Sequence, residues 1–167
     1  NFEFFVTDPS FGTAVLNTVW LLGSVILITV VVGIAIALLI NDPFPGRGIV
    51  RVLLISPFFV MPTVNALMWK NMMMNPIYGV LAQVSIFFGL TPINWLEDFP
   101  LLSVIIMVAW QWVPFATLIL LTSLQSLDGE QKEAAQMDGT PPLSFFWYII
   151  LRHLIRPMTV VILIETI

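Results

Sequence analysis

A long run without any charged residue, Ala14 to Ile40, constrains this chain more than any other feature. A helix needs roughly 20 predominantly apolar residues to cross the hydrocarbon core of a bilayer, and this run exceeds that length even when tilted. A soluble protein would have to hide the whole helix inside a large core. The run therefore predicts a membrane-spanning helix over residues 14–40.

The composition extends this argument to the whole chain. Hydrophobic residues make up 59% of the 167 residues, charged residues only 10%, and the mean hydropathy is +0.99. Polar side chains are too few to cover a soluble surface of this length. We therefore expect an all-α membrane protein, a polytopic helical bundle whose backbone groups are paired within helices. Cysteine is absent, so no disulfide framework or thiol site is available.

Further apolar segments follow the first one. We expect a second span at about 52–69, a third at about 101–124, and a fourth at 158–167 that is cut short. Residues 77–90 are apolar but short for a span, which favours an interfacial or half-inserted helix. The chain begins without Met and ends inside an apolar run, so we expect a single transmembrane domain that is an internal piece of a longer protein.

Two prolines mark the second predicted span. Pro57 and Pro62 each remove a backbone donor and bend a helix, which lipid tolerates only where neighbours or a cavity satisfy the freed carbonyls. A kinked helix beside a solute pathway and a simple packing kink both remain open. The first span contains small residues that would let another helix approach closely, which indicates packing rather than a site: Gly23, Ser24, Gly33 and Ala35.

Aromatic, amide and carboxylate side chains in the predicted spans are candidate contacts for a solute. An indole face can cover the C–H face of a polyol while a nearby amide meets its hydroxyls. A carboxylate inside a membrane helix is costly and indicates a polar partner or a pathway. Core packing is the favoured interpretation of Trp112, and an interfacial position that of His153. The candidates are Asn65, Trp69, Trp110, Gln111 and Glu165.

Charge, glycine and paired proline collect in residues 128–157, between two apolar blocks. Asp128 followed three residues later by Gln131 has the form of a capping box, so a short helix should begin there. Good helix formers continue to Met137, and Gly139 then supplies the left-handed residue that commonly follows a helix end. The segment therefore predicts a cytoplasmic docking loop with a short helix of its own.

A second short helix should follow the glycine at once. Thr140 is its expected N-cap, and Pro141 is expected in the first helical position, where the missing N–H costs nothing. In the first helix, Ala134 and Ala135 carry almost no side chain, so a partner could approach the backbone closely with Glu133 at the rim. This shape is suited to insertion into a groove.

The loop carries a set of residues at spacings that are hard to obtain by chance: Glu133, Ala134, Ala135, Asp138, Gly139, Phe145 or Phe146, Ile149, Leu151 and Pro157. This pattern resembles the EAA loop of the membrane permease subunits of binding-protein-dependent ABC importers. The family usually reads Ile-Thr-Leu-Pro where this chain has Ile149-Ile150-Leu151-Arg152, which leaves the bend after the second helix open. Further residues agree with the carbohydrate-importing branch: Asn17, Thr18, Pro57, Pro62, Trp110, Pro114 and Phe115.

The resemblance implies the fold of a type I importer permease, maltose-permease-like, in a bacterial cytoplasmic membrane. It implies that Glu133, Ala134, Ala135, Asp138 and Gly139 contact a separate ATPase subunit, which would use the ATP while this chain binds no cofactor. The other expected partners are a second, different permease subunit, a solute-binding protein, membrane lipid, and a sugar or polyol substrate. Transport would proceed by alternating access.

Charge placement fits this topology, because the positive residues gather on one side. The cytoplasmic set is Arg47, Arg51, Lys132, Arg152 and Arg156, which leaves only Lys70 outside. No G-x-x-x-x-G-K-[ST] phosphate loop, metal-ligand cluster or hydrolase set is present, so we expect neither ATP hydrolysis by this chain nor a metal or nucleic-acid site. An amino-acid, phosphate or metal importer remains open, as does a channel or an ion-coupled carrier, although Glu165 is the one intramembrane charge such a protein could use.

Overall fold

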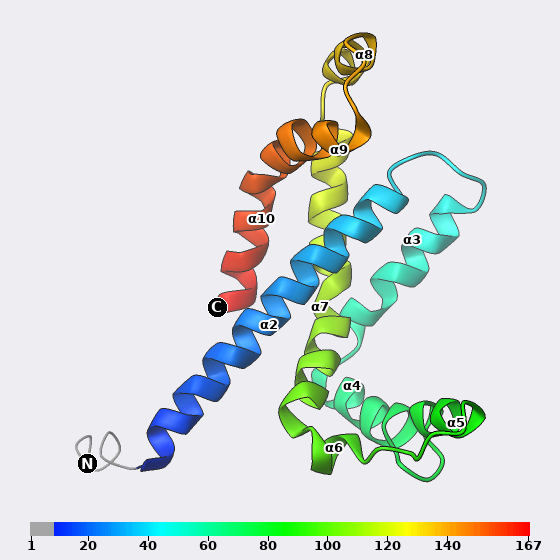
Figure 1. The fold of residues 1–167 in the computed structure, drawn as a ribbon, viewed down its shortest axis with the longest axis vertical. Coiled ribbons are helices and arrows are strands. Elements are labelled where there is room, and N and C mark those ends of the chain that lie inside the picture. The colour runs from blue at the N-terminus through cyan, green and yellow to red at the C-terminus, as the bar shows by residue number, and fades with distance from the viewer. Residues whose placement is uncertain (1–8) are drawn as a thin grey trace. The chain divides into compact units, whose positions relative to one another are not determined.

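The computed structural model describes residues 9–167, apart from the side chains of Pro9, Glu130, Lys132 and Gln136, so the expected position of the Lys132 side chain lies outside the description. Every regular element in this range is helical, which confirms the all-α fold (Figure 1). The α-helices are α2 (Pro9–Leu39), α3 (Arg47–Ile55), α4 (Pro62–Met68), α5 (Val80–Phe87), α6 (Trp95–Asp98), α7 (Pro100–Gln125), α8 (Gly129–Met137), α9 (Pro142–Phe145) and α10 (Leu151–Thr166). A 3-10 turn, η1 (Ser56–Phe59), and two π-helical turns, η2 (Trp69–Met73) and η3 (Phe146–Ile150), connect them.

Three helices in the described range are long and apolar enough to cross a membrane: Ser10–Leu39, Pro100–Gln125 and Pro142–Thr166. The bent pair Arg47–Phe59 and Pro62–Met73 adds a fourth candidate if it counts as one broken span. The first helix begins before the predicted boundary at residue 14. Residues 77–90 contain the short helix α5.

The second predicted span is broken rather than kinked. After η1 the helix stops, and Met61 has an extended backbone with φ −58° and ψ 138°. The ring of Pro62 excludes the α region for the residue before it, and Pro62 itself then opens α4 at the first helical position. The expected kinked span over 52–69 is therefore corrected to two helical pieces separated at residues 60 and 61.

The last helix also differs from expectation. The sequence predicts a second short helix after Gly139 and a separate span from residue 158, but α9, η3 and α10 follow one another without a break as far as Thr166. Arg152 keeps a backbone donor where the importer motif usually has proline, so nothing stops the helix there. Pro157 lies inside α10 and removes only one intrahelical hydrogen bond.

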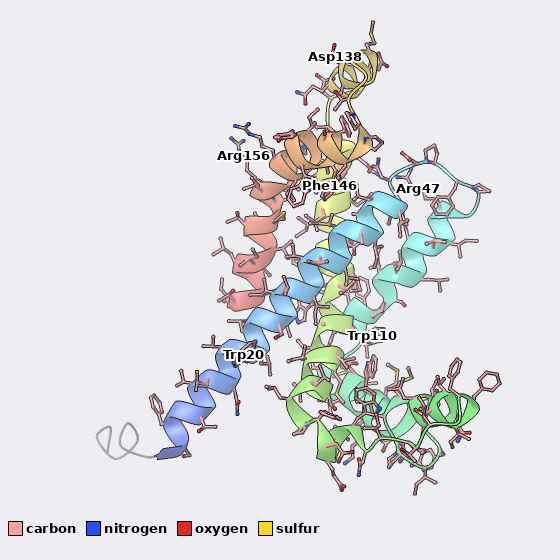
Figure 2. All side chains as sticks on the ribbon, viewed as in Figure 1. Trp20, Arg47, Trp110, Asp138, Phe146 and Arg156 are labelled. Atoms are coloured by element: carbon pink, nitrogen blue, oxygen red, sulfur yellow. The ribbon has the colours of Figure 1, made fainter. Side chains whose placement is uncertain are left out.

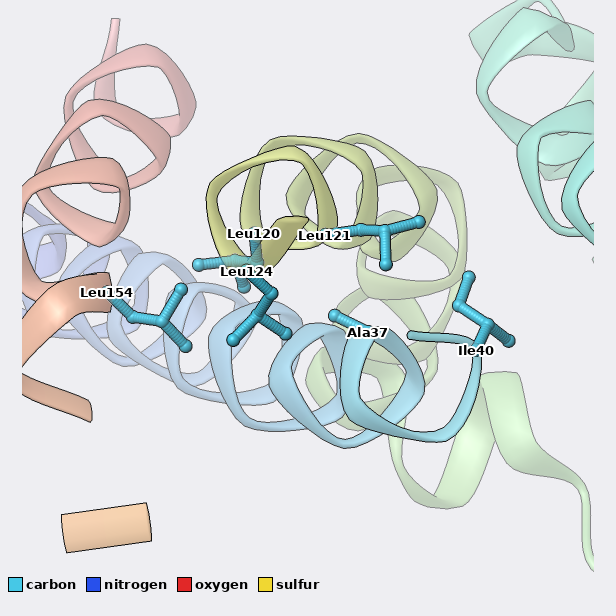
Figure 3. Close-up of a cluster of buried hydrophobic side chains, with 6 residues drawn as sticks. All are labelled: Ala37, Ile40, Leu120, Leu121, Leu124 and Leu154. Atoms are coloured by element: carbon cyan, nitrogen blue, oxygen red, sulfur yellow. The ribbon is translucent and has the colours of Figure 1, made fainter. Parts of the chain in front are cut away.

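The chain packs as two compact units, and α2 and α7 contribute residues to both. Unit 1 contains the chain as far as Leu27 together with Phe59–Gln111, and unit 2 contains Ile28–Phe58 and Trp112–Ile167. The core of unit 2 joins the end of α2 to the second half of α7 and to α10 (Figure 3). Its buried residues are Ala37, Ile40, Leu120, Leu121, Leu124 and Leu154.

The core of unit 1 is aromatic and sulfur-rich. Trp69, Met74 and Met107 form its buried centre, so α7 packs against the turn η2. The hydroxyl of Ser103 lies 2.7 Å from the carbonyl oxygen of Trp95 and 2.9 Å from that of Phe99, so it links the start of α7 to α6.

Gly33 permits a close contact between α2 and α7 in unit 2. A Cβ atom at this position would lie 3.1 Å from the Cβ of Ala116 and 3.3 Å from the backbone nitrogen of Thr117 on α7. The sequence-based prediction that Gly33 admits a neighbouring helix is thus confirmed. At Gly23, on the same helix, an added Cβ would meet nothing within 4 Å.

These two glycines give a matched stability test. We expect Gly33→Val to force α2 and α7 apart and to destabilise the protein by about 1–3 kcal/mol, the usual range for overpacking. Gly23→Val should change stability much less, because its surroundings are open. Thermal unfolding of the two variants of the complete protein in detergent measures the difference, and equal melting temperatures would contradict the helix contact.

Candidate functional sites

The helix of the docking loop ends as its sequence predicts. Helix α8 begins directly after Asp128, and Gly139 has φ +66°, the left-handed conformation expected of it. The N–H of Thr140 donates to the carbonyl of Ala135 at 3.0 Å, which is the hydrogen bond of a Schellman motif that spans more residues, the 6→1 bond. The glycine therefore closes α8 and turns the chain towards the next helix. The capping box itself stays a prediction.

The surface of α8 matches the expected docking face in part. Glu133, Ala134 and Asp138 are exposed, and Figure 2 shows Asp138 at the end of α8, the helix that projects beyond the rest of unit 2. Ala135 is only 8% exposed, so the structure corrects the expectation that both alanines are open to a partner. Met137, which sequence reasoning missed, is 88% exposed and places a large apolar side chain beside the motif.

The second loop helix starts one residue later than predicted. Pro141 is its N-cap, with an extended backbone, and Pro142 takes the first helical position. The reason is again the residue-before-proline rule, since Pro142 excludes the α region for Pro141. Thr140 therefore cannot be the N-cap.

Helix α10 is fastened to the end of α7 by His153. Its Nε2 atom lies 2.9 Å from the carbonyl oxygen of Ser123 and 3.4 Å from the hydroxyl of Ser126. The next residue, Leu154, is fully buried in the core of unit 2. The helix that leaves the docking loop is thus attached to a second spanning helix by a polar and an apolar contact.

Four of the candidate solute contacts come together in unit 1. The amide nitrogen of Gln111 donates to the carbonyl of Val60 at 2.6 Å, and its oxygen accepts from Asn65 Nδ2 at 3.0 Å. The indole rings of Trp69 and Trp110 meet edge to face, with centroids 5.9 Å apart and an interplanar angle of 75°. Asn65 also donates to the carbonyl of Met107 at 3.0 Å. We call this group, Asn65, Trp69, Trp110 and Gln111, the amide-indole cluster.

The cluster contains an unpaired acceptor and an unpaired donor. Asn65 Oδ1 and Trp69 Nε1 are buried and have no hydrogen-bond partner, although both residues are more than nine-tenths buried. They stand four residues apart, on one face of the helix formed by α4 and η2. Turns of the π type occur frequently at functional sites, and η2 begins at Trp69. A hydroxyl group, which both donates and accepts, would complement this pair.

The fifth candidate, Glu165, belongs to unit 2. Its Oε2 atom accepts a hydrogen bond of 2.8 Å from the hydroxyl of Thr29, and its Oε1 atom is buried without a partner. Thr29 is completely buried on α2. The expected polar partner of the carboxylate is therefore Thr29, which sequence reasoning did not identify, because a threonine in an apolar run gives no signal.

Trp112 packs as expected, not as part of the cluster. Its ring meets Phe58 at 6.0 Å and Phe115 at 5.7 Å, both edge to face, and those two phenylalanines stack on each other at 5.4 Å. Across residues 9–167, apart from the undescribed side chains, no group of three or more His, Asp or Glu residues is placed to hold a metal ion.

The fold and the loop together define a polytopic helical membrane protein whose short helix α8 is exposed. The chain belongs to the family of binding-protein-dependent transport system inner membrane components, whose match covers residues 2–167. The family confirms the expected resemblance and the location in the inner membrane.

Relatives and solved structures agree with this assignment. The chain is 41% identical over 74% of its length to a probable ABC transporter permease protein, y4oQ, of Sinorhizobium fredii, and 33% identical over 80% to the trehalose/maltose transport system permease protein MalF of Thermococcus litoralis. These matches cover 40% and 45% of the relatives, so the chain spans less than half their length. The fold resembles that of a bacterial ABC transporter involved in alginate import, with a TM-score of 0.81 and 22% identity over 98% of this chain and 58% of that one.

The Gln111 hydrogen bonds can be tested directly. We expect Gln111→Leu to leave the Val60 carbonyl unsatisfied and to cost about 1–3 kcal/mol of stability. Gln83→Leu is a matched control, since Gln83 makes one exposed hydrogen bond of 3.3 Å to the Ile77 carbonyl and should lose little. Thermal unfolding of the complete protein compares the two variants. If the Gln111 variant is as stable as the control, the amide does not stabilise the interruption between η1 and α4.

Proposed function

We propose that this chain is part of the permease of an ATP-driven importer and that the solute is a sugar or sugar alcohol. Membership of the transport family supports the first part, and the trehalose/maltose name of one relative supports the second. The hydroxyl-matching pair in the amide-indole cluster favours a polyhydroxylated solute over an amino acid or phosphate, because Asn65 Oδ1 and Trp69 Nε1 are neutral.

The observation that carries the proposal is the attachment of α8. This exposed helix is joined through Gly139 and the proline pair to a helix that runs unbroken from Pro142 to Thr166. A partner that grips α8 can therefore move a spanning helix. The energy comes from a separate ATPase, which uses ATP, while this chain has no phosphate loop and binds no cofactor.

The complete importer then needs three kinds of partner. Two ATPase subunits hold the docking helices, a second and different permease subunit completes the pathway, and a solute-binding protein delivers the solute from outside. ATP binding closes the ATPase pair, moves Glu133 to Gly139 with the groove that holds them, and opens the pathway outward. Hydrolysis resets the pathway to face inward.

Solute contact is proposed for the amide-indole cluster and for Glu165. Asn65 and Trp69 offer an acceptor and a donor, and the Trp110 ring offers an apolar face beside them. Glu165 Oε1 can accept a hydrogen bond from a solute hydroxyl, because Thr29 donates only to Oε2. Within the cluster, Gln111 also positions Asn65, because its amide oxygen accepts a hydrogen bond from Asn65 Nδ2.

Coupling through the docking helix is testable at its glycines. We expect Gly139→Val to abolish binding-protein-stimulated ATPase activity, because a β-branched residue is strongly disfavoured at φ +66°. Gly129→Val, at the start of the same helix where a Cβ meets nothing within 4 Å, should retain most of it. The assay uses the complete permease assembled with its ATPase subunits, with and without solute-loaded binding protein. Normal stimulation in the Gly139 variant would refute the coupling role.

The solute contacts are testable by removing one N–H group. We expect Trp69→Phe to raise the KM for solute about tenfold, the value of one hydrogen bond, with the ring contacts largely kept. Trp95→Phe, in the same core but outside the cluster, should leave the KM unchanged. Uptake by proteoliposomes measures both. If both variants keep the stimulated ATPase activity and have the same KM for solute, the importer function is supported but the amide-indole cluster is not a solute site.

A further inference from the structure

Two arginines of unit 2 lie side by side at the start of α3. Arg47 and Arg51 are one helical turn apart and therefore share a face of the helix. Val50 and Leu54, close to them on the helical surface, pack against the core of unit 2, so the arginines face inward rather than away from the protein. Figure 2 shows Arg47 where the loop from α2 enters α3.

Both guanidinium groups converge on one amide. With the Gln125 amide oriented so that its oxygen faces them, this oxygen accepts from Arg47 Nη2 at 2.8 Å and from Arg51 Nη2 at 2.5 Å. Arg47 also donates to the carbonyl of Asn41 at 2.7 Å. The Nε atoms of both arginines are buried and have no partner. Two positive charges thus share a single neutral acceptor at the end of α7.

No negative charge balances this pair within the described part of the chain. No carboxylate of the described side chains lies within 4.0 Å of either guanidinium group. Asp42, in the adjoining loop, is exposed and forms no ion pair with them. Both positive charges are partly removed from water, which costs free energy, and their only partners are neutral oxygen atoms. A bound anion would offset this cost, so the pair should attract one.

The surroundings indicate which anion fits. The arginines lie at the cytoplasmic end of apolar helices, where the positive residues of the chain gather. The opposite face of α3 is apolar and open, with Ile49, Val52 and Leu53 each more than 60% exposed. Paired guanidinium forks match the oxygens of a phosphate, and basic pockets between spanning helices on this side of a membrane bind anionic headgroups.

We propose that Arg47 and Arg51 form a phosphate-binding site, and that the phosphate is the headgroup of an anionic phospholipid in the cytoplasmic leaflet. The lipid phosphate sits on the exposed edge of the two guanidinium groups, and its acyl chains lie along the apolar helix. The site ties the loop after α2 and the end of α7 to the membrane surface through Asn41 and Gln125.

The test uses the complete permease purified with its partner subunits and stripped of lipid. Phosphatidylglycerol, phosphatidylcholine and inorganic phosphate are each added, and bound lipid is counted by native mass spectrometry while thermal unfolding is followed in parallel. We expect phosphatidylglycerol to bind and to raise the melting temperature. We expect Arg47→Gln and Arg51→Gln to weaken its binding about tenfold each, and Arg51→Lys to weaken it less, because the charge stays and the fork is lost.

Arg156→Gln is the matched control, since Arg156 is an exposed arginine on α10 that, like Arg51, follows another arginine, Arg152, by one helical turn. It should bind phosphatidylglycerol as the wild type does. Equal binding of phosphatidylcholine, or equal weakening in the control, would overturn the site. Equal stabilisation by inorganic phosphate would overturn the lipid as its source. Because the wild-type comparison of the three additives stands alone, the proposal remains testable even if a glutamine variant fails to assemble.

Discussion

The hydrogen bonds of Gln111 are the constraint on which unit 1 depends. Pro62 breaks the helix within a candidate span, and lipid would supply no water to satisfy the carbonyl that the break frees. An amide from α7 meets that carbonyl at Val60 and, with its other end, fixes Asn65 just after the break. One side chain thus replaces the backbone pairing that an unbroken helix would supply, which makes an interruption tolerable where it would otherwise be costly.

This arrangement divides the amide-indole cluster into supporting and available groups. Gln111 uses both ends of its amide within the protein, and the Asn65 nitrogen is shared between Gln111 and Met107. What remains is one acceptor on Asn65 and one donor on Trp69, held in place by groups that are already satisfied. A binding site gains from such preorganisation, since the solute then pays little to order the groups it meets. The cost is carried by two buried polar atoms that are unpaired when no solute or water reaches them.

Features encoded by neighbouring residues were predictable from the sequence, and features that depend on distant residues were not. The start of α8 and the left-handed Gly139 follow from local chemistry, and the all-α class follows from composition. The N-cap of α9 was misplaced by one residue because the constraint that one proline imposes on the proline before it was overlooked. The contact between Thr29 and Glu165 joins residues 136 positions apart, and no sequence pattern in either helix predicts it.

Contacts within unit 2 would allow a displacement of α8 to be transmitted to the helix that follows it. Gly139 and the proline pair make a stiff corner, since proline fixes its own φ and restricts the residue before it. Beyond the corner, η3 inserts one extra residue into a helical turn without ending the helix. Two adjacent residues attach α10 to its neighbours: His153 is hydrogen-bonded to the end of α7, and Leu154 is buried in the core of unit 2. Because His153 and Leu154 attach α10 to the end of α7, a displacement of α8 would move α7 with it or break that contact, so the proposed coupling would act on two spanning helices together.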